Sequence, residues 1–386
     1  MSMDQFSEIR PYLDHEIRPV LDRLLDNPEF LLSIASFSHP RLTRMLPGLV
    51  KSLAKKRLTA QLRDVHNVAT MQDVIAVYMD KMIADTTDGL THSGLENLKP
   101  DVNYLFVSNH RDIAMDPAFV NYVLYHGGLG TLQIAIGDNL LKKPFVSDLM
   151  RLNKSFIVRR SLKGRELLKA LDLLSEYIHY CVGNDHNVWI AQREGRAKDG
   201  VDKTDPALIK MLARGKRNLP LGESIDSLHV VPVSISYEYD ACDVLKAEEL
   251  YQVETVGKYV KDEASDINSI VTGITGYKGK VHVAIGKRLG DTYHPVSNDP
   301  ETVATAIDEQ VVENYRLHDS NFIALEMLRE RELMRIPPMS SEVRARKIGA
   351  DKRRVFEQRV AGVDERLHRH LLSMYANPVI SRYRLL

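Results

Sequence analysis

The chain contains few of the residues and runs that build cross-linked, metal-clustered or membrane-spanning proteins. Two cysteines, Cys181 and Cys242, stand among 386 residues, too few and too far apart for a disulfide framework or a zinc cluster. No apolar run approaches the ~20 residues that a helix needs to cross a bilayer. The first residues lack the basic and then apolar stretches of a signal peptide. We therefore expect a protein of the reducing cytoplasm.

An excess of charge of one sign is also missing. The 52 basic and 52 acidic residues balance, so a global positive field that would attract nucleic acid is excluded, and we expect no nucleic-acid partner. The hydrophobic share of 44% and the charged share of 27% are those of a folded globular protein. The length allows two or three structural units.

The hydrophobic pattern changes twice along the chain. Residues 1–90 follow a helical period, residues 91–300 alternate short apolar runs with amphipathic ones, and residues 301–386 return to a helical period before an extended tail at Pro378. The candidate strands are 103–108, 131–136, 155–159, 187–192, 229–236 and 280–285. Helices are expected at 161–181 and within 240–275. This order predicts an α/β fold, with a mixed, largely parallel sheet flanked by helices, between helical N-terminal and C-terminal regions.

The first candidate for chemistry is His110, which follows the predicted strand 103–108. Asp116 comes six positions later, and Pro117 suits the first turn of a helix. An imidazole at a strand end can serve as a general base when a carboxylate holds its second nitrogen. Asp112 is a second carboxylate within reach, so either acid could orient the histidine; the residues after Asp116 favour Asp116.

Three downstream segments also carry functional residue types. The first segment, Phe156 to Gly164, begins as a strand that ends near Arg160. The second is a loop from Arg193 to Gly200 that contains Arg196 between glycines. The third is an apolar strand from Val230 to Ser236 with Pro232 inside it. Arginine suits a phosphate because its planar fork donates two parallel hydrogen bonds. A proline within a strand predicts a bulge or a sheet edge.

In this order, the four segments resemble the four motifs of the glycerolipid acyltransferase superfamily of bacterial type, the glycerol-3-phosphate and 1-acylglycerol-3-phosphate acyltransferases. The resemblance covers about residues 90 to 290. The sequence departs from the family in two motifs. Five residues separate His110 from Asp116, where the family has four. In the third motif one residue fewer separates Gly195 from Arg196, and Arg193 stands where the family has Pro or Val. A kinase catalytic loop at residues 110–112 is excluded, since Pro117 stands where the required Asn would be.

The resemblance implies transfer of a fatty acyl group from acyl-CoA or acyl carrier protein to a hydroxyl of a glycerophosphate acceptor, with neither cofactor nor metal. His110 would be the base and Asp116 its partner. The implied substrate-binding residues are Asn109, Arg160, Glu194, Gly195 and Arg196. Glycerol-3-phosphate and 1-acylglycerol-3-phosphate both stay open as acceptors. The altered spacing leaves one alternative, a non-catalytic lipid- or membrane-binding protein on the same fold.

One segment departs from the balance of charge. Residues 41–63 carry seven basic residues and no acid, and Pro47 and Gly48 predict a break within them. The apolar residues that recur there at helical spacing are Met45, Leu46, Leu49, Val50 and Leu53. Such a stripe beside a basic face is typical of a helix on an anionic membrane and also of a helix packed on its own domain. The first interpretation would make the protein peripheral on the inner face of the cytoplasmic membrane.

Overall fold

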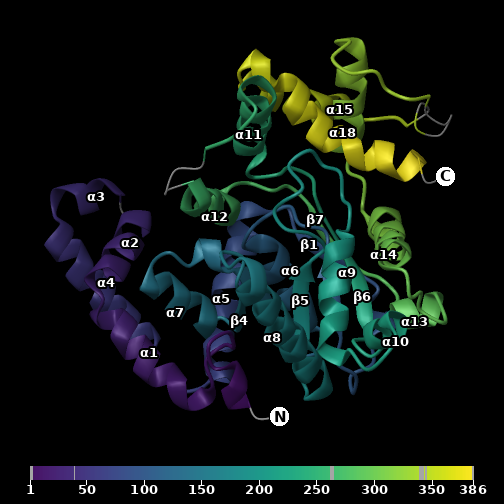
Figure 1. The fold of residues 1–386 in the computed structure, drawn as a ribbon. Coiled ribbons are helices and arrows are strands. Elements are labelled where there is room, and N and C mark those ends of the chain that lie inside the picture. Colours follow the sequence, from purple (N-terminus) through teal and green to yellow (C-terminus); the bar gives the residue numbers. More distant parts are fainter. Residues whose placement is uncertain (1–2, 39, 261–264, 339–342, 344–345, 385–386) are drawn as a thin grey trace. The chain divides into compact units, whose positions relative to one another are not determined.

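The structure is a computed structural model that describes residues 3–38, 40–260, 265–338, 343 and 346–384 (Figure 1). The chain forms two compact units that interleave along the sequence. Unit 1 contains residues 1–79 and 132–177, and unit 2 contains residues 80–131 and 178–386. The sequence had predicted a division at residues 90 and 300, whereas the unit boundaries fall inside two helices and next to a strand.

Unit 1 is mainly helical. Its helices are α1 (Asp14–Asp26), α2 (Pro28–Ser38), α3 (Pro40–Met45), α4 (Pro47–Gln61), most of α5 (Val68–Thr86), α7 (Pro144–Leu152) and most of α8 (Gly164–Gly183). Strands β3 (Leu132–Gly137) and β4 (Ser155–Val158) pair in parallel, with Ile134 opposite Ser155. An apolar cluster that includes Ile17, Leu21 and Phe145 joins α1 to α7. The predicted break in the basic segment is confirmed, because α3 ends at Met45 and α4 begins at Pro47.

The described part of unit 2 is built on five strands. They are β1 (Leu90–Ser93), β2 (Leu105–Ser108), β5 (Asn187–Ala191), β6 (Val230–Tyr237) and β7 (Val281–Ile285), in the spatial order β1-β7-β6-β2-β5. Only β6 and β7 run antiparallel within this set. The predicted mixed, largely parallel sheet is therefore confirmed. The carboxyl ends of β2, β5 and β6 point the same way, so the segments that follow them leave from one edge of the sheet.

Pro232 lies in an inner strand and not at a sheet edge. Strand β6 pairs with β2 on one side and with β7 on the other, and Pro232 is in register with Val107 of β2. The ladder with β7 begins only at Val233, and the Pro232 carbonyl accepts a bond from Gly286 N–H just beyond it. The missing proline N–H therefore falls where β7 has ended, which is why an inner strand tolerates it.

Helices cover the rest of unit 2. They are α6 (Met115–His126), α9 (Pro206–Leu212), α10 (Leu221–Asp226), α11 (Asp243–Val256), α12 (Ser265–Thr275), α13 (Leu289–Thr292), α14 (Pro300–Asn314), α15 (Asp319–Glu330), α17 (Ala350–Ala361) and α18 (His368–Arg384). Two of them begin with an Asp-Pro pair. Asp299 accepts a bond from Thr302 N–H before α14, and Asp205 accepts one from Ala207 N–H before α9.

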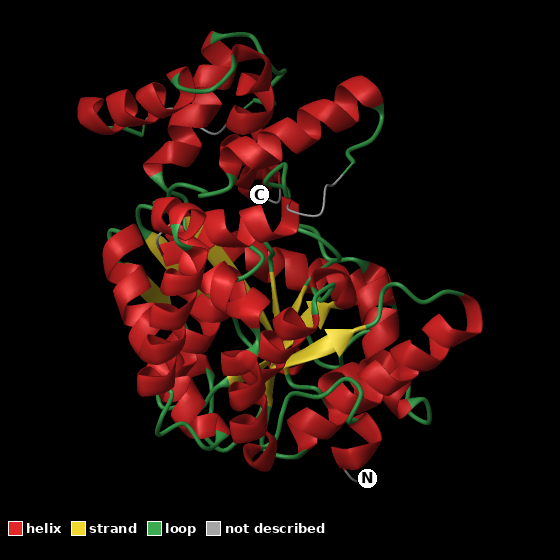
Figure 2. Ribbon diagram, turned by 90° about the vertical axis from the view of Figure 1, so that its left-hand side faces the viewer, coloured by secondary structure: helices red, strands yellow, loops and turns green. Residues whose placement is uncertain are grey.

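A helical cluster without strands forms one end of unit 2 (Figure 2). Most of its buried side chains come from α15, α17 and α18, and include Phe322, Phe356 and Leu371. The predicted extended tail at Pro378 is wrong, because Pro378 lies inside α18. The proline removes the N–H that would bond the Met374 carbonyl, and Gly200 packs directly on that carbonyl, where a Cβ would come within 2.1 Å of its oxygen.

Candidate active site

The segment after β2 carries His110 and is held in place by Asn109. The buried Asn109 amide bonds both backbone groups of Ile235 in β6, at 2.8 and 3.0 Å, and also donates to Asp202 at 3.3 Å. The Asn109 side chain thus bridges the end of β2 to β6 and fixes the position at which the backbone continues to His110. The predicted substrate-binding residue Asn109 is engaged with the protein itself.

His110 contacts the carboxylate of Asp116. Its Nδ1 lies 2.9 Å from Asp116 Oδ2, and its imidazole side chain is 14% exposed while the carboxylate is fully buried. The imidazole meets the edge of Trp189 with ring centroids 5.8 Å apart. Because Asp116 occupies Nδ1, the nitrogen available to exchange a proton with a substrate is Nε2.

The five residues between His110 and Asp116, one more than in the resembling family, form a tight turn. The N–H groups of Arg111 and Asp112 both point at Asp116 Oδ2, at 2.5 and 2.8 Å. Asp112 Oδ1 accepts bonds from the N–H groups of Ala114 and Met115, both at 2.9 Å, where α6 begins. Asp112 therefore closes the turn, and Asp116 is the acid that contacts the imidazole. Burial and the nearby Asp116 charge raise the pKa of Asp112.

Two buried ion pairs hold the same turn. The Arg111 guanidinium donates to Asp202 Oδ2 at 2.5 Å and lies over the Tyr315 ring, while Lys246 Nζ donates to the Arg111 carbonyl at 2.6 Å. Lys246 also pairs with Asp240, which follows β6. The side chains of Arg111 and Asp202 are 4% and 6% exposed, so water screens this pair little. The peptide that faces Asp116 is thus fixed from both sides.

The loop after β5 lies against His110. Ala197 N–H donates to the His110 carbonyl at 2.7 Å, which ties this loop to the backbone of His110. Glu194 and Gly195 are exposed, and Gly195 has a φ of +75°, a conformation that favours glycine. Arg196 Nη2 donates to Ser269 Oγ of α12 at 3.2 Å, while its buried Nη1 has no partner among the described residues. A buried guanidinium nitrogen without a partner is costly unless an anion binds there.

Arg160 belongs to unit 1, whereas the other predicted site residues belong to unit 2. It is exposed and follows β4, where its N–H donates to Asp138 Oδ1 at 3.1 Å. Its guanidinium lies over Gly137 at the end of β3, where a Cβ would be 3.2 Å from Nη1. The ends of β3 and β4 therefore present this arginine together.

Comparison with known proteins finds a family that matches part of the chain. Residues 89–236 match the sequence model of a family described as Acyltransferase. These residues form a domain of the glycerolipid acyltransferase superfamily. The acyltransferase domain contains the carboxyl ends of β2 and β5 with both loops described above.

Curated relatives and a solved structure extend this likeness. The chain is 33% identical to a glycerol-3-phosphate acyltransferase of Xanthomonas axonopodis pv. citri over 106 residues, 28% of this chain and 12% of that protein. It is 26% identical to one of Pseudomonas syringae pv. tomato over 287 residues, 73% of this chain and 32% of that protein. The chain thus spans at most a third of the length of either relative. The Thermotoga maritima 1-acyl-sn-glycerophosphate acyltransferase PlsC is 16% identical, with 74% of this chain and 95% of that chain covered at a TM-score of 0.35.

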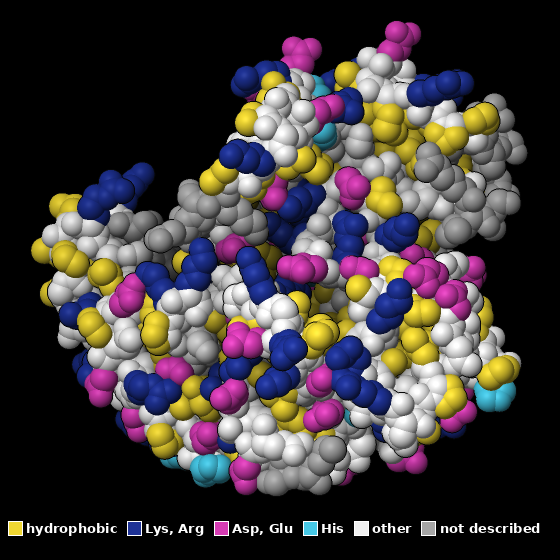
Figure 3. Space-filling model, in the orientation of Figure 1, with side chains coloured by type: hydrophobic (Ala, Val, Ile, Leu, Met, Phe, Trp, Pro, Cys, Tyr) yellow, Lys and Arg dark blue, Asp and Glu magenta, His cyan; other side chains and the backbone are white. Residues whose placement is uncertain are grey.

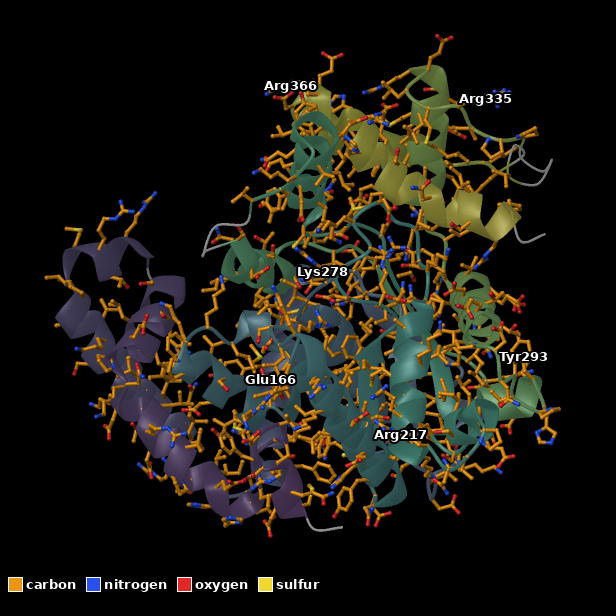
Figure 4. The ribbon with its side chains drawn as sticks, in the orientation of Figure 1. Glu166, Arg217, Lys278, Tyr293, Arg335 and Arg366 are labelled. Atoms are coloured by element: carbon orange, nitrogen blue, oxygen red, sulfur yellow. The ribbon has the colours of Figure 1, made fainter. Side chains whose placement is uncertain are left out.

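A second group of buried residues lies beside Asp112. Cys242 Sγ is 3.9 Å from Asp112 Oδ2, and Gly273 of α12 packs so closely that a Cβ would come within 2.1 Å of that oxygen. Lys278 lies beside α12, where it donates to the carbonyls of Ile274 and Gly276 (Figure 4). Burial lowers the pKa of Lys278 to about 8, although the charge of Asp112 opposes this.

The sequence pointed to none of the residues that support the acyltransferase domain's histidine from a distance. Asp202 and Lys246 bond the turn across 91 and 135 positions, and no local pattern marks such partners. Tyr237 had a signal, because it shares a strand face with Val233 and Ile235 in the fourth motif. Across the described ranges, no cluster of three or more His, Cys, Asp or Glu side chains suits a metal ion. No described helix has the length and apolar character that crossing a membrane requires.

Proposed function

We propose that this protein is an acyltransferase that moves a fatty acyl group from an acyl thioester to a hydroxyl of a glycerophosphate in phospholipid biosynthesis. The observation that carries the proposal is the pair of His110 and the buried Asp116 inside the acyltransferase domain. The acceptor is glycerol-3-phosphate or 1-acylglycerol-3-phosphate. The names of the curated relatives favour the first of these.

The proposed reaction needs one base and no covalent enzyme intermediate. His110 Nε2 takes the proton from the acceptor hydroxyl as its oxygen attacks the thioester carbonyl carbon. Asp116 holds the imidazole by Nδ1 and stabilises the imidazolium that forms. The tetrahedral intermediate then expels the thiolate, which takes the proton from Nε2. The products are the acylated glycerophosphate and a free thiol of coenzyme A or acyl carrier protein.

The proposed phosphate ligand is Arg196, with Arg160 as a second candidate. Arg196 follows the exposed Glu194 and Gly195 in the loop next to His110, and its buried Nη1 lacks a partner among the residues that the structure describes. An acceptor phosphate would supply that partner through a charge-assisted hydrogen bond. In this proposal the exposed Glu194 accepts a hydrogen bond from a hydroxyl of the acceptor.

The test is an acyl-transfer assay with purified protein. Acyl-CoA and acyl carrier protein thioesters are each paired with glycerol-3-phosphate and with 1-acylglycerol-3-phosphate, and His110→Ala serves as the comparison. We expect turnover with one acceptor and a loss of ~10²–10⁴-fold in the variant. Absence of turnover in every pairing would leave the non-catalytic lipid-binding protein as the better account, and full activity of His110→Ala would exclude this mechanism.

We also propose that unit 1 docks on an anionic membrane through the α3–α4 surface. We define this surface by the exposed apolar side chains Leu42, Met45, Leu46, Leu49 and Leu53 and the exposed basic side chains Arg41, Arg44, Lys55, Lys56 and Arg57. Figure 3 shows basic and apolar side chains next to one another at this end of unit 1. Met45 is 75% and Leu49 is 60% exposed, so packing on the chain's own domain leaves most of the stripe in water.

Vesicle co-sedimentation tests the docking. Each basic residue near an anionic surface contributes up to about 1 kcal/mol, so binding to vesicles that contain phosphatidylglycerol should weaken as salt rises. Leu49→Ser with Leu53→Ser should weaken it further. Val256→Ser is the matched control, because Val256 is 68% exposed but lies in α11 of unit 2. Binding that ignores lipid charge, or equal losses in the control, would exclude this surface.

A further inference from the structure

The Asp116 carboxylate receives a fourth hydrogen bond, from Tyr237 of β6. Tyr237 Oη donates to Asp116 Oδ1 at 2.7 Å, whereas the His110 ring and the two N–H groups of the turn all bond Oδ2. Tyr237 is thus the partner of the second carboxylate oxygen. Both Asp116 and the Tyr237 ring are buried, so water cannot take the place of the phenol.

The position of the phenol is fixed by packing and does not depend on the hydrogen bond. All eight residues of β6 are buried, and the register of β6 with β2 places Val233 opposite Ser108. The Tyr237 ring packs on Phe119, with centroids 6.0 Å apart, and Phe119 lies three residues after Asp116 in α6. Strand β6 and helix α6 therefore aim the hydroxyl at the carboxylate before the two groups bond.

We propose that Tyr237 is a positioning residue that fixes the orientation and the basicity of Asp116 and thereby tunes His110. The proposal rests on the proposed function for its kinetic part. A carboxylate whose charge is shared among four donors attracts the imidazolium less than one with three. The hydroxyl also stops the carboxylate from rotating, which keeps Oδ2 on Nδ1.

The other ionisable groups around this pair are engaged separately. Asp112 and Asp240 face Tyr237, and their charges together with burial raise its pKa well above the usual value, so it stays a donor at every pH of interest. The charged groups that complete the surroundings of the pair are Arg111, which pairs with Asp202, and Lys246, which pairs with Asp240. Tyr315 lies under the Arg111 guanidinium. Among these groups, Asp112 is the one whose own titration could shift the His110 midpoint in the same way, because its pKa is raised and it bonds the same turn.

The test is Tyr237→Phe in the full chain, a change that keeps the ring on Phe119 and removes one oxygen. The titration of the His110 imidazole is followed by NMR, with its signal assigned by comparison with His110→Ala. We expect its midpoint to rise by roughly half to one pH unit, because the unshared carboxylate charge stabilises the imidazolium. The acid limb of kcat/KM should move up by the same amount, with a loss of kcat of about tenfold.

Tyr375→Phe is the matched control. Tyr375 is buried in α18, donates to the buried Asp243 at 2.7 Å and accepts a bond from Asp240 N–H at 2.9 Å, so Tyr375→Phe loses a phenol–carboxylate bond that does not involve Asp116. It should leave the His110 midpoint unchanged. The rise of the His110 midpoint caused by Tyr237→Phe should persist when Asp112→Asn is added. It should disappear when Asp116→Asn is added instead.

A His110 midpoint in Tyr237→Phe equal to that in Tyr375→Phe would overturn the proposal. A shift that disappears with Asp112→Asn would also overturn it, because the effect would then belong to Asp112. The NMR titration needs no turnover, so a shifted midpoint in a protein that transfers no acyl group would refute the proposed function and leave the positioning role standing.

Discussion

Removal of the Asp202 charge should destabilise unit 2 far more than an ordinary ion-pair substitution. In Asp202→Asn, the Arg111 guanidinium keeps its burial and its place over Tyr315 but loses its carboxylate. Breaking a buried pair from one side costs roughly 3–5 kcal/mol, because the remaining charge is left without compensation. Both side chains are less than a tenth exposed, so no large discount for solvent screening applies.

Urea unfolding followed by tryptophan fluorescence measures this effect in the correct unit. The chain has one tryptophan, Trp189, which lies in β5 of unit 2. We expect the midpoint to fall by about 1 M or more. Asp85→Asn is the control, because its pair with Lys81 is 56% and 74% exposed and should contribute less than about 1 kcal/mol.

A double variant that removes both charges of the Arg111–Asp202 pair is the second comparison. Arg111→Met with Asp202→Leu takes away both charges, and should recover most of the stability that Asp202→Asn loses, since no unpaired charge remains. If Asp202→Asn loses no more stability than Asp85→Asn, the pair does not hold the turn and the account of the buried network is refuted.

Three further predictions concern the site and its surroundings. Asp116→Asn should lower kcat by ~10²–10⁴-fold and Asp112→Asn only mildly, because only Asp116 contacts Nδ1; the reverse order in a steady-state assay would assign the orienting role to Asp112. Arg196→Ala and Arg160→Ala should each raise the Michaelis constant for the acceptor by roughly 10- to 100-fold with little effect on the donor constant, and lysine should rescue neither fully; a change in the donor constant alone would place that arginine at the donor phosphates. Lys278 has a folded pKa of about 8 against 10.5 in a model peptide, so from about pH 8 to 9.5 the unfolded chain binds more protons and the free energy of unfolding should rise with pH. Lys278→Met should remove that rise in urea titrations, and an unchanged slope would show that Lys278 does not carry it.

The strands with apolar sequences could be predicted, and the polar one could not. The six predicted strands correspond to β2 through β7, with ends displaced by a few residues. Strand β1 was missed because it is only Leu90–Ser93, with one apolar residue, and most of it is exposed at the edge of its sheet. Its pairing with β7 is set by a partner about 190 residues away, which a local pattern does not contain.

The candidate site divides in the same way. The candidate site residues His110, Asp116 and Arg196 are recognisable because they stand in short segments that follow strands. The residues that hold this segment in place are distant in the sequence. Lys246 of α11, for example, donates a hydrogen bond to the Arg111 carbonyl. The tail was mispredicted for a related reason, since Gly200, which packs on the carbonyl that Pro378 leaves without its helical N–H, lies far away in the sequence.

The turn between His110 and Asp116 has a consequence for searches of other genomes. Its two converging N–H groups and the cap from Asp112 bring the acid to the imidazole although the gap is five residues long. In this chain the distance between the His110 and Asp116 side chains is therefore set by the shape of the turn and not by the number of residues between them. A search pattern that demands a gap of four would overlook such chains, whereas one that allows five and requires a capping Asp, Asn or Ser at the third position would retrieve them.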